Sequence, residues 1–352
     1  MTRILQVLLF PVSLCYGMVM QVRNLLFDMH ILPSMTFDRP VISVGNLTYG
    51  GTGKTPHIEY LIRLLSPGKF IATLSRGYGR QSDGFILASK RSNVKYIGDE
   101  PMQFQKKFEN IKVAVDEKRS RGIRILLEKF PELKVILLDD AFQHRYVKPG
   151  LSILLTDYHR IYPEDTILPS GTLREFKTGA RRADIIIVTK TPKIFSPITR
   201  RRIMEELKPD SRQRVYFSFI KYIEPVPVSD PMNLTLPPKL TNILLFTGIA
   251  NDYPLREHLE RMCSELIVMK FADHHPYTVK NIEQIIRTFR NLPTQKKIVV
   301  TTEKDVMRLK TPELSAYLKN LPLFCVPMQI DFHGTDKEKF DNEILQYVEK
   351  NQ

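Results

Sequence analysis

The glycine-rich segment at residues 50–55 constrains the fold of this chain more than any other feature of its sequence. It lies between an apolar run at 41–45 and a helical pattern that begins near Thr55, and its residues are Gly50-Gly51-Thr52-Gly53-Lys54-Thr55. Glycines let backbone N–H groups approach phosphate oxygens, and the positive end of the following helix attracts the same oxygens. A strand, such a turn and a helix in this order predict a phosphate-binding loop.

Two residues at the end of this loop have an expected partner in a bound nucleotide and its metal ion. We expect Lys54 to reach the β- and γ-phosphates and Thr55 to offer its hydroxyl to Mg²⁺. The strict pattern requires a glycine at position 48, where this chain has Thr48, but the flanking strand and helix still predict nucleotide binding. The expected nucleotide-binding residues are Thr48, Tyr49, Gly50, Gly51, Thr52, Gly53, Lys54 and Thr55.

Short apolar runs alternate with helical stretches on both sides of the proline-rich segment 224–238. Runs so continuously apolar suit parallel strands, and their alternation with helices is typical of a doubly wound sheet. The sequence therefore predicts an α/β protein with a P-loop NTPase-type sheet, a second, smaller α/β lobe and an N-terminal apolar helix. The expected bounds are 1–30 for the helix, 31–225 for the nucleotide-binding domain, about 225–240 for a linker and 240–352 for the smaller lobe.

The charge and the cysteine count exclude several classes of protein. Lys plus Arg number 52 and Asp plus Glu 38, which gives a net charge of +14. Such an excess suits nucleic acid, an anionic membrane or a phosphorylated substrate. Nothing in the sequence has zinc-ligand spacing, an RNP motif or a helix-turn-helix pattern, which argues against nucleic acid. The three widely spaced cysteines exclude a disulfide scaffold and a thiolate zinc site, and they fit a reducing compartment.

The N-terminal stretch from Ile4 to Val22 is mostly apolar and is flanked by Arg3 and Arg23. Its length reaches the lower limit for crossing a bilayer, but polar residues and a proline interrupt it. A cleaved signal peptide does not fit, because no small-residue cleavage site follows. We favour a helix that lies in or against the membrane interface, and a helix that packs only on its own domain stays open. Both arrangements leave the rest of the chain in the cytosol.

Pairs of carboxylates lie at the end of one predicted strand and at the start of one predicted helix. Asp139 and Asp140 end the apolar run 135–138, and together with the glycine-rich loop they predict a Mg²⁺ site of the Walker-B kind rather than a simple turn. Asp99 and Glu100 begin a predicted helix. Asp99 is either a helix cap or a base that accepts a hydroxyl proton during phosphoryl transfer.

Histidines and arginines complete the set of candidate residues. Asp273-His274-His275 follows a predicted strand and is a metal site, an orienting pair or a loop. Metal chelation is the least favoured of the three, because two adjacent histidines point in different directions. His144 follows the two aspartates at the carboxyl end of the strand, where ligands of α/β sheets collect, and it is either a site residue or only an orienting or structural histidine. Arg76 and Arg80 follow another strand end closely enough to line a cleft, although most such charges are merely solvated.

Eight motifs in one order resemble the tetraacyldisaccharide 4′-kinase family of lipid A biosynthesis. They are GGTGKTP, RGYGR, GDEP, LLDDAFQHR, LPSGTLRE, FTGIAN, FADHH and TTEKD, and the resemblance extends from the N-terminal helix to about residue 310. It implies a membrane-associated P-loop kinase that uses ATP and Mg²⁺. The implied reaction phosphorylates the 4′-hydroxyl of a tetraacylated glucosamine disaccharide 1-phosphate and gives lipid IV-A. The implied location is the cytoplasmic face of the inner membrane, where the enzyme would be peripheral or monotopic.

The same resemblance assigns roles to individual residues. Asp99 would match the catalytic base and His274 its dyad partner, whereas Glu100, Asp139 and Asp140 would match positions around Mg²⁺. Gln143, His144 and Glu175 match other motif positions whose individual roles stay open. Ala141 departs from the family pattern, which often has glycine there, and this would matter only if the turn needs a positive φ.

A P-loop ATPase of the partitioning or maturation type is the main alternative. Such proteins carry a similar glycine-rich loop, but they generally have a lysine just before the glycine pair, where this chain has Tyr49. They also give no reason for the FADHH and RGYGR motifs. The partners that the resemblance implies are a lipid disaccharide 1-phosphate and an anionic inner-membrane surface, without nucleic acid.

Overall fold

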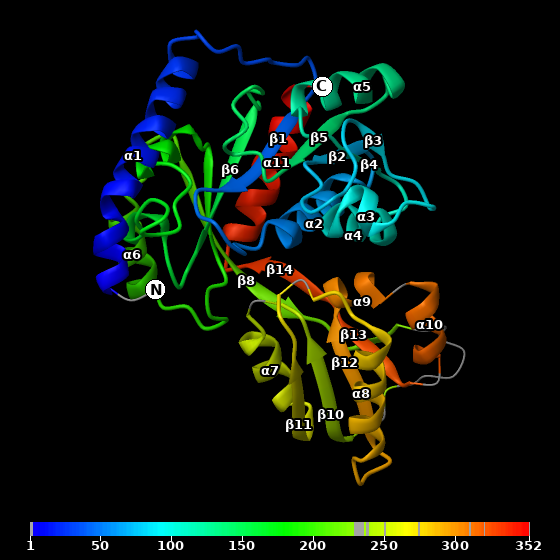
Figure 1. The fold of residues 1–352 in the computed structure, drawn as a ribbon. Coiled ribbons are helices and arrows are strands. Elements are labelled where there is room, and N and C mark those ends of the chain that lie inside the picture. Colours follow the sequence, from blue (N-terminus) through cyan, green and yellow to red (C-terminus); the bar gives the residue numbers. More distant parts are fainter. Residues whose placement is uncertain are drawn as a thin grey trace. The chain divides into compact units, whose positions relative to one another are not determined.

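The computed structural model describes residues 3–228, 236, 239–249, 251–273, 275–309, 311–319 and 321–351. They form two compact units. The first unit contains Met1–Ile220 together with Ile330–Gln352, and the second contains Lys221–Gln329. Figure 1 labels most of the helices and strands of both units.

The first unit is built on a sheet in the strand order β14-β8-β7-β6-β1-β5-β2-β4-β3. The strands from β8 to β4 pair in parallel, and β3 pairs antiparallel with β4. This confirms the predicted parallel α/β sheet. The strands are β1 (Val41–Asn46), β2 (Ile71–Ser75), β3 (Ile86–Leu87), β4 (Lys112–Val115), β5 (Val135–Asp139), β6 (Leu151–Asp157), β7 (Ile185–Thr189), β8 (Arg214–Tyr222) and β14 (Met328–Phe332).

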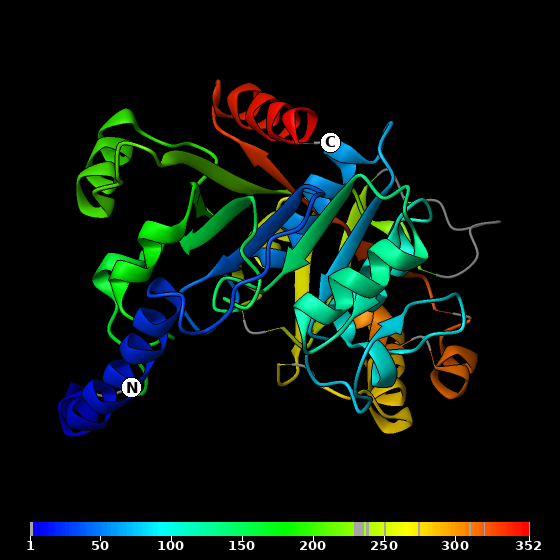
Figure 2. The ribbon, with the colours of Figure 1, turned by 90° about the horizontal axis from the view of Figure 1, so that it is seen from above.

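Helices cover both faces of this sheet because alternate residues of its strands point to opposite sides. Ile42 and Val44 pack in one apolar cluster with α2 and α11, whereas Val41 packs in another with α5. Figure 2 shows α11 along one face of the sheet. The helices are α1 (Arg3–Asp28), α2 (Lys54–Leu65), α3 (Val94–Ile97), α4 (Asp99–Lys107), α5 (Arg119–Lys129), α6 (Pro197–Leu207) and α11 (Asp336–Lys350), with 3₁₀ turns η1 (Tyr162–Glu164) and η2 (Lys177–Arg182).

The C-terminal segment belongs to the first unit, which corrects the expected second lobe at 240–352. Residues Ile330–Gln352 return to the first unit, where β14 joins the large sheet and α11 packs on it. Phe340, Ile344 and Val348 of α11 are buried in the same apolar cluster as β1. The periodicity of α11 shows that one face is apolar, but it does not show which sheet that face covers.

The second unit has a smaller sheet in the order β11-β10-β12-β13-β9. Its strands pair in parallel except β9, which is antiparallel to β13. The strands are β9 (Val226–Pro227), β10 (Leu240–Thr247), β11 (Cys263–Lys270), β12 (Lys297–Thr302) and β13 (Leu323–Val326). The helices are α7 (Tyr253–Glu260), α8 (Val279–Arg290), α9 (Glu303–Leu309) and α10 (Pro312–Leu318).

A buried carboxylate organises one end of this second sheet. Asp305 is 0% exposed and accepts hydrogen bonds from Thr302 Oγ1 at 2.7 Å, Tyr277 Oη at 3.1 Å and the backbone N–H of Gly248 at 3.2 Å. Arg308 lies 3.2 Å from the same carboxylate. A buried charge with this many partners is satisfied. Asp305 therefore joins the FTGIAN and TTEKD segments at the carboxyl ends of β10 and β12.

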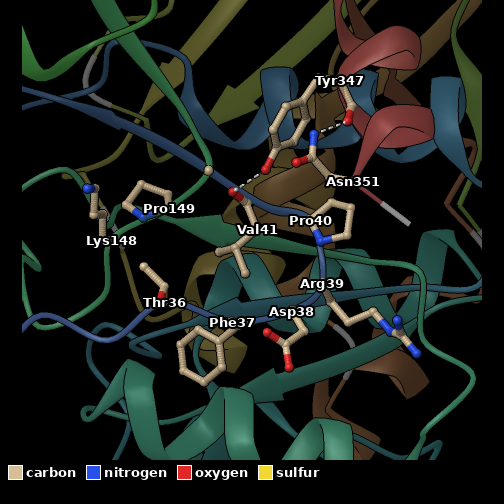
Figure 3. Close-up of a pocket in the computed structure, with 11 residues that line it drawn as sticks. Thr36, Phe37, Asp38, Arg39, Pro40, Val41, Lys148, Pro149, Tyr347 and Asn351 are labelled. Atoms are coloured by element: carbon tan, nitrogen blue, oxygen red, sulfur yellow. Dashed lines mark hydrogen bonds between the residues drawn. The ribbon is translucent and has the colours of Figure 1, made fainter.

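A cavity of about 260 Å³ lies at the amino end of β1 (Figure 3). It is lined by Thr36, Phe37, Asp38, Arg39, Pro40, Val41, Lys148, Pro149, Gly150, Tyr347 and Asn351. The glycine-rich loop follows the opposite end of β1, after Asn46. This cavity is therefore separate from the predicted phosphate site.

A buried ionic cluster joins α2 to α4. Glu59 of α2 is 1% exposed, and its carboxylate lies 2.7 Å from Gln103 Nε2, 2.8 Å from Lys107 Nζ and 2.9 Å from an Arg63 nitrogen. The helix that begins at Lys54 is thereby attached to the helix that begins at Asp99.

We expect Glu59→Ala to lower the free energy of unfolding by about 2–3 kcal/mol, because Gln103 and Arg63 lose their hydrogen bonds to a buried carboxylate. Urea denaturation followed by circular dichroism measures the change. Glu128→Ala on α5 is the matched control, because Glu128 is exposed, and it should change stability by less than about 0.5 kcal/mol. Equal losses in the two variants would contradict a stabilising role for the Glu59 cluster.

Candidate functional site

The glycine-rich loop connects the end of β1 to the start of α2. Gly50 has a φ of 128° and Gly53 a φ of 87°, a backbone region that favours glycine. The loop is fixed at two points. The backbone N–H of Tyr49 donates to the carbonyl of Thr172 at 2.6 Å, and Thr189 Oγ1 donates to the carbonyl of Thr52 at 2.9 Å.

Lys54, the first residue of α2, lies between the carboxyl ends of two neighbouring strands. Its Nζ is 3.3 Å from Asn46 Oδ1 at the end of β1 and 3.5 Å from Asp140 Oδ1 just after β5. Thr55 follows in the first turn of α2 and is buried. The structure thus brings together the lysine, the threonine and one of the two aspartates that the sequence singled out.

Asp139 and Asp140 are placed beside the loop because β5 pairs with β1. Val44 and Asp139 are partners in the parallel register. Asp140, the next residue, has a φ of 47°, whereas Ala141 is not in the left-handed region. The positive φ that this turn requires is therefore at Asp140, and Ala141 does not strain it.

The two adjacent carboxyl groups have opposite pKa shifts. Burial raises the pKa of Asp139 to about 7, and the nearby charges of Glu100 and Asp140 add to the effect. Burial also acts to raise the pKa of Asp140, but the charges of Lys54 and Arg174 outweigh it and hold that pKa below its ordinary value. At neutral pH, Asp140 is fully charged, whereas Asp139 is close to its midpoint.

This donor set suits Mg²⁺ only together with a bound polyphosphate. In the part of the chain that the structure describes, no group of three His, Cys, Asp or Glu side chains could hold a metal ion by itself. Mg²⁺ in kinases, however, is usually bound by one or two carboxylates together with substrate phosphates and water. Asp139 Oδ1 is buried and has no hydrogen-bond partner among the described residues. An oxygen of this kind fits a cation ligand.

Asp99 is the first residue of α4, and Glu100 is the second. The N-cap position belongs to Gly98, whose φ is 90° and which has no side chain to cap the helix. Asp99 is therefore not the side-chain cap, although a carboxylate in the first turn still interacts favourably with the helix dipole. Both acids are half-buried, and Glu100 is close enough to raise the pKa of Asp139.

Arg174 is a site residue that the sequence analysis missed. Its guanidinium lies 3.1 Å from Asp140 Oδ1 and 3.3 Å from Gln143 Oε1. Its backbone N–H donates to the carbonyl of Leu47 at 2.7 Å, so its segment pairs with the glycine-rich loop. The sequence signal that could have identified Arg174 is its position next to Glu175 in the LPSGTLRE motif.

Glu175 and Gln143 form a buried network beside this arginine. Glu175 is 1% exposed, and Arg182 donates to its carboxylate at 2.7 Å and 2.9 Å. Gln143 Nε2 donates to Glu175 Oε1 at 3.1 Å and to the carbonyl of Asn46 at 2.9 Å. The network connects the segment after β5 to the end of β1.

His144 and Arg119 form hydrogen bonds that connect the start of α5 to the end of β5 and the segment after it. His144 Nε2 accepts the backbone N–H of Arg119 at 3.3 Å, at the start of α5. Burial, with the charges of Arg119, Arg23 and Arg76, lowers the pKa of His144 to about 4, so the ring is neutral. Arg119 is 2% exposed and donates to the carbonyl of Asp139 at 3.2 Å. The geometry favours the structural role for His144.

The two arginines of the RGYGR motif differ in their surroundings. Arg80 is paired with Glu117 at 2.6 Å and donates to the carbonyl of Gly84 at 2.8 Å, so it holds its own loop. Arg76 is exposed, and its charge contributes to the lowered pKa of His144. Of the two, Arg76 is the one available to a bound anion.

His274 lies outside the described residues, so its pairing with Asp99 stays a prediction. Its neighbour His275 belongs to the second unit, and His275 Nε2 is 3.1 Å from Asn281 Oδ1. The His275 ring also stacks on Phe271 with a centroid separation of 4.8 Å. These contacts make His275 a structural residue of its loop.

Comparisons with known proteins identify the family of this chain. The profile of the family described as Tetraacyldisaccharide-1-P 4′-kinase matches residues 5–349. Two relatives with the name tetraacyldisaccharide 4′-kinase are each 46% identical to the chain. The protein of Bacteroides thetaiotaomicron aligns over 97% of this chain and 93% of its own length, and that of Flavobacterium psychrophilum over 97% and 96%.

A solved structure extends the similarity to three dimensions. The crystal structure of the "apo" form of LpxK from Aquifex aeolicus in complex with ATP matches with a TM-score of 0.74 and 27% identity, covering 98% of this chain and 99% of that one. A family match over nearly the whole length and relatives this similar leave one assignment. The chain belongs to the tetraacyldisaccharide 4′-kinase family.

Proposed function

We propose that this protein transfers the γ-phosphate of ATP to the 4′-hydroxyl of a tetraacylated glucosamine disaccharide 1-phosphate and gives lipid IV-A, a step of lipid A biosynthesis. The observation that supports this most directly is the position of Lys54 between Asn46 and Asp140, in a chain of this family. The glycine-rich loop would bind the phosphates of ATP through its backbone N–H groups, and Lys54 would contact the β- and γ-phosphates.

Mg²⁺, when bound with ATP, would neutralise charge that develops on the transferred phosphoryl group. Thr55 and Asp139 are the side chains best placed to hold it, with Glu100 and Asp140 around them. The charges of Lys54 and Arg174 hold the pKa of Asp140 below its ordinary value, and the guanidinium of Arg174 contacts that carboxylate. Arg76, which is exposed, would assist in binding an anionic substrate.

Asp99 and His274 would act together on the acceptor hydroxyl. A sugar hydroxyl is a weak acid, and a loose phosphoryl-transfer transition state requires positioning of the hydroxyl more than full deprotonation. A half-buried carboxylate at the start of α4 suits this role, and Glu59 attaches that helix to the helix of the phosphate loop. The histidine would orient the carboxylate and favour its charged form.

The outer face of α1 suits a membrane surface. The helix is long and apolar enough to cross a membrane by length and composition alone, and only 11% of its most apolar window is buried. The other face of α1 packs on the rest of the first unit. For example, Tyr16 Oη donates a hydrogen bond to the carbonyl of Arg174 at 2.9 Å. Exposed apolar residues on this helix and just after it are Val7, Leu8, Phe10, Val12, Leu14, Met18, Val19, Val22, Leu25 and Met29.

This combination favours a helix that rests on its domain and inserts its outer face into the membrane interface. Acyl chains leave a bilayer at a cost of about 0.8 kcal/mol per CH₂, so the enzyme would come to its lipid substrate. The net charge of +14 would add attraction to an anionic leaflet. We therefore place the protein on the cytoplasmic face of the inner membrane, as a peripheral or monotopic enzyme.

The reaction is tested with γ-labelled ATP, Mg²⁺ and the lipid disaccharide 1-phosphate, followed by separation of lipid from free phosphate. We expect label in the lipid with the wild-type protein. Lys54→Ala should lose about 10²-fold or more of this activity, because it removes a preorganised charge from the phosphates. Lys129→Ala, an exposed lysine on α5, should stay near wild type. Label found only in free phosphate would instead support an ATPase.

The dyad is tested with single and double variants of Asp99 and His274. Asp99→Ala and His274→Ala should each lower kcat by about 10²–10⁴-fold with little change in the KM for ATP. Because two residues that act as a unit are not additive, the double variant should cost little more than the worse single one.

His275→Ala is the matched control for the dyad, because the structure gives His275 a packing role. His275→Ala should lower the melting temperature and leave kcat near the wild-type value. A fully active Asp99→Ala enzyme, or a double variant whose loss is the product of the two single losses, would refute the dyad.

Membrane binding is tested by co-sedimentation with vesicles that contain anionic lipid. Val22→Glu places a charge on the apolar outer face, where Val22 is 56% exposed, and should reduce the vesicle-bound fraction several-fold. Gln21→Glu adds the same charge at the neighbouring exposed polar position and should have a smaller effect. Equal losses in both variants would indicate that net charge, rather than apolar insertion, holds the protein on the vesicle.

A further inference from the structure

The inner face of α1 carries a buried asparagine that contacts the network beside the phosphate loop. Asn24 is 7% exposed, and its Nδ2 donates to Glu175 Oε2 at 2.7 Å. Glu175 itself is 1% exposed, so both groups are removed from water. A hydrogen bond to a buried carboxylate is among the stronger ones in proteins.

From Glu175, hydrogen bonds continue to the residues around Lys54. Gln143 Nε2 bonds to Glu175 Oε1 at 3.1 Å, and Gln143 Oε1 accepts from Arg174 at 3.3 Å. Arg174 in turn contacts Asp140 at 3.1 Å, and Asp140 lies 3.5 Å from the Lys54 ammonium group. Every step from α1 to the candidate phosphate site is thus a direct polar contact.

The last turns of α1 also hold the backbone of the segment after β5. Arg23 donates to the carbonyl of Gln143 at 3.2 Å, and Arg145 donates to the carbonyl of Asn24 at 2.8 Å. Both guanidinium groups lie 5.1 Å from the ring centroid of Phe27, which is 3% exposed. The segment that contains Gln143 is therefore fixed from the α1 side.

A buried asparagine at position 24 stabilises the packing of α1 less than an apolar side chain would. Its Oδ1 is buried and has no hydrogen-bond partner within the described ranges. An unpartnered buried oxygen lowers the stability of the folded state, and an apolar side chain at this position would avoid that loss. A buried polar group of this kind calls for an explanation other than stability.

We propose that Asn24 is a positioning residue for phosphoryl transfer, which acts through Glu175 and Gln143 on the placement of Arg174, Asp140 and Lys54. The membrane-facing helix is then also part of the scaffold of the nucleotide site: its outer face binds lipid and its inner face orients charged groups. This inference rests on the proposed kinase function, and it adds a role for α1 beyond attachment to the membrane.

Asn24→Leu tests the inference, because it keeps the branched shape of the side chain and removes the hydrogen bond to Glu175. With detergent-dispersed lipid acceptor, kcat should fall about 10- to 100-fold, as expected when reacting groups are misplaced. The KM for ATP should stay within about twofold, because the backbone N–H groups of the glycine-rich loop would still bind the phosphates, and the contacts from Thr172 and Thr189 that fix this backbone are unchanged. Vesicle binding should also be unchanged, since the outer face of α1 is intact.

Ser13→Ala is the matched control on the same buried face of α1. Ser13 is 1% exposed, and its hydroxyl oxygen lies 2.6 Å from Ser170 Oγ and accepts the backbone N–H of Ser170 at 2.8 Å. Its loss should lower the melting temperature, as Asn24→Leu does, but leave kcat within about threefold. If Asn24→Leu melts below the assay temperature, Asn24→Ala replaces it in the same comparison.

A near-wild-type kcat for the Asn24 variant, or equal kcat losses in the Asn24 and Ser13 variants, would overturn the inference. The second result would mean that any loosening of α1 slows the enzyme. A wild-type protein that transfers no label to the lipid would instead overturn the proposed function, and the inference with it. An active wild type with an unaffected Asn24 variant overturns the inference alone.

Discussion

The parallel pairing of β1 with β5 is the contact on which the candidate site depends. Because Val44 pairs with Asp139, the strand that leads into the glycine-rich loop and the strand that ends in two carboxylates finish at the same edge of the sheet. Lys54 then lies within polar contact of both Asn46 and Asp140. The carboxyl edge of a parallel sheet is where α/β proteins collect ligands, since it gathers loops that are distant in sequence.

Environment gives the two neighbouring aspartates different properties. Asp139 is enclosed in the sheet, and burial raises its pKa to about 7, whereas Lys54 and Arg174 hold the pKa of Asp140 low. Asp140 therefore stays charged and pairs with the side chains of Lys54 and Arg174. The carboxyl group of Asp139 loses its proton more readily when a positive charge is placed beside it. This pair suits a site that receives a divalent cation together with a nucleotide, because the cation favours the charged form of Asp139.

The same helix that offers an apolar surface to solvent also contributes to the site. Its outer residues are exposed and apolar, whereas Asn24 on its inner face bonds to the buried Glu175. Glu175 accepts hydrogen bonds from α1, from the segment after β5 and from Arg182 of η2. A carboxylate with partners from three segments holds those segments in one arrangement, since moving any of them would leave a buried charge without a partner.

The sequence by itself determined the α/β class, the phosphate loop and the positions of most strands. The runs at 41–45 and 135–138, for example, correspond to Val41–Asn46 and Val135–Asp139. Only the tertiary structure decided that Ile330–Gln352 joins the first unit, that Arg174 contacts Asp140 and that Asn24 contacts Glu175. The physical reason is that a local pattern records the period and the apolar face of an element. The partner of that face, and of each buried polar group, is chosen by packing across the whole chain.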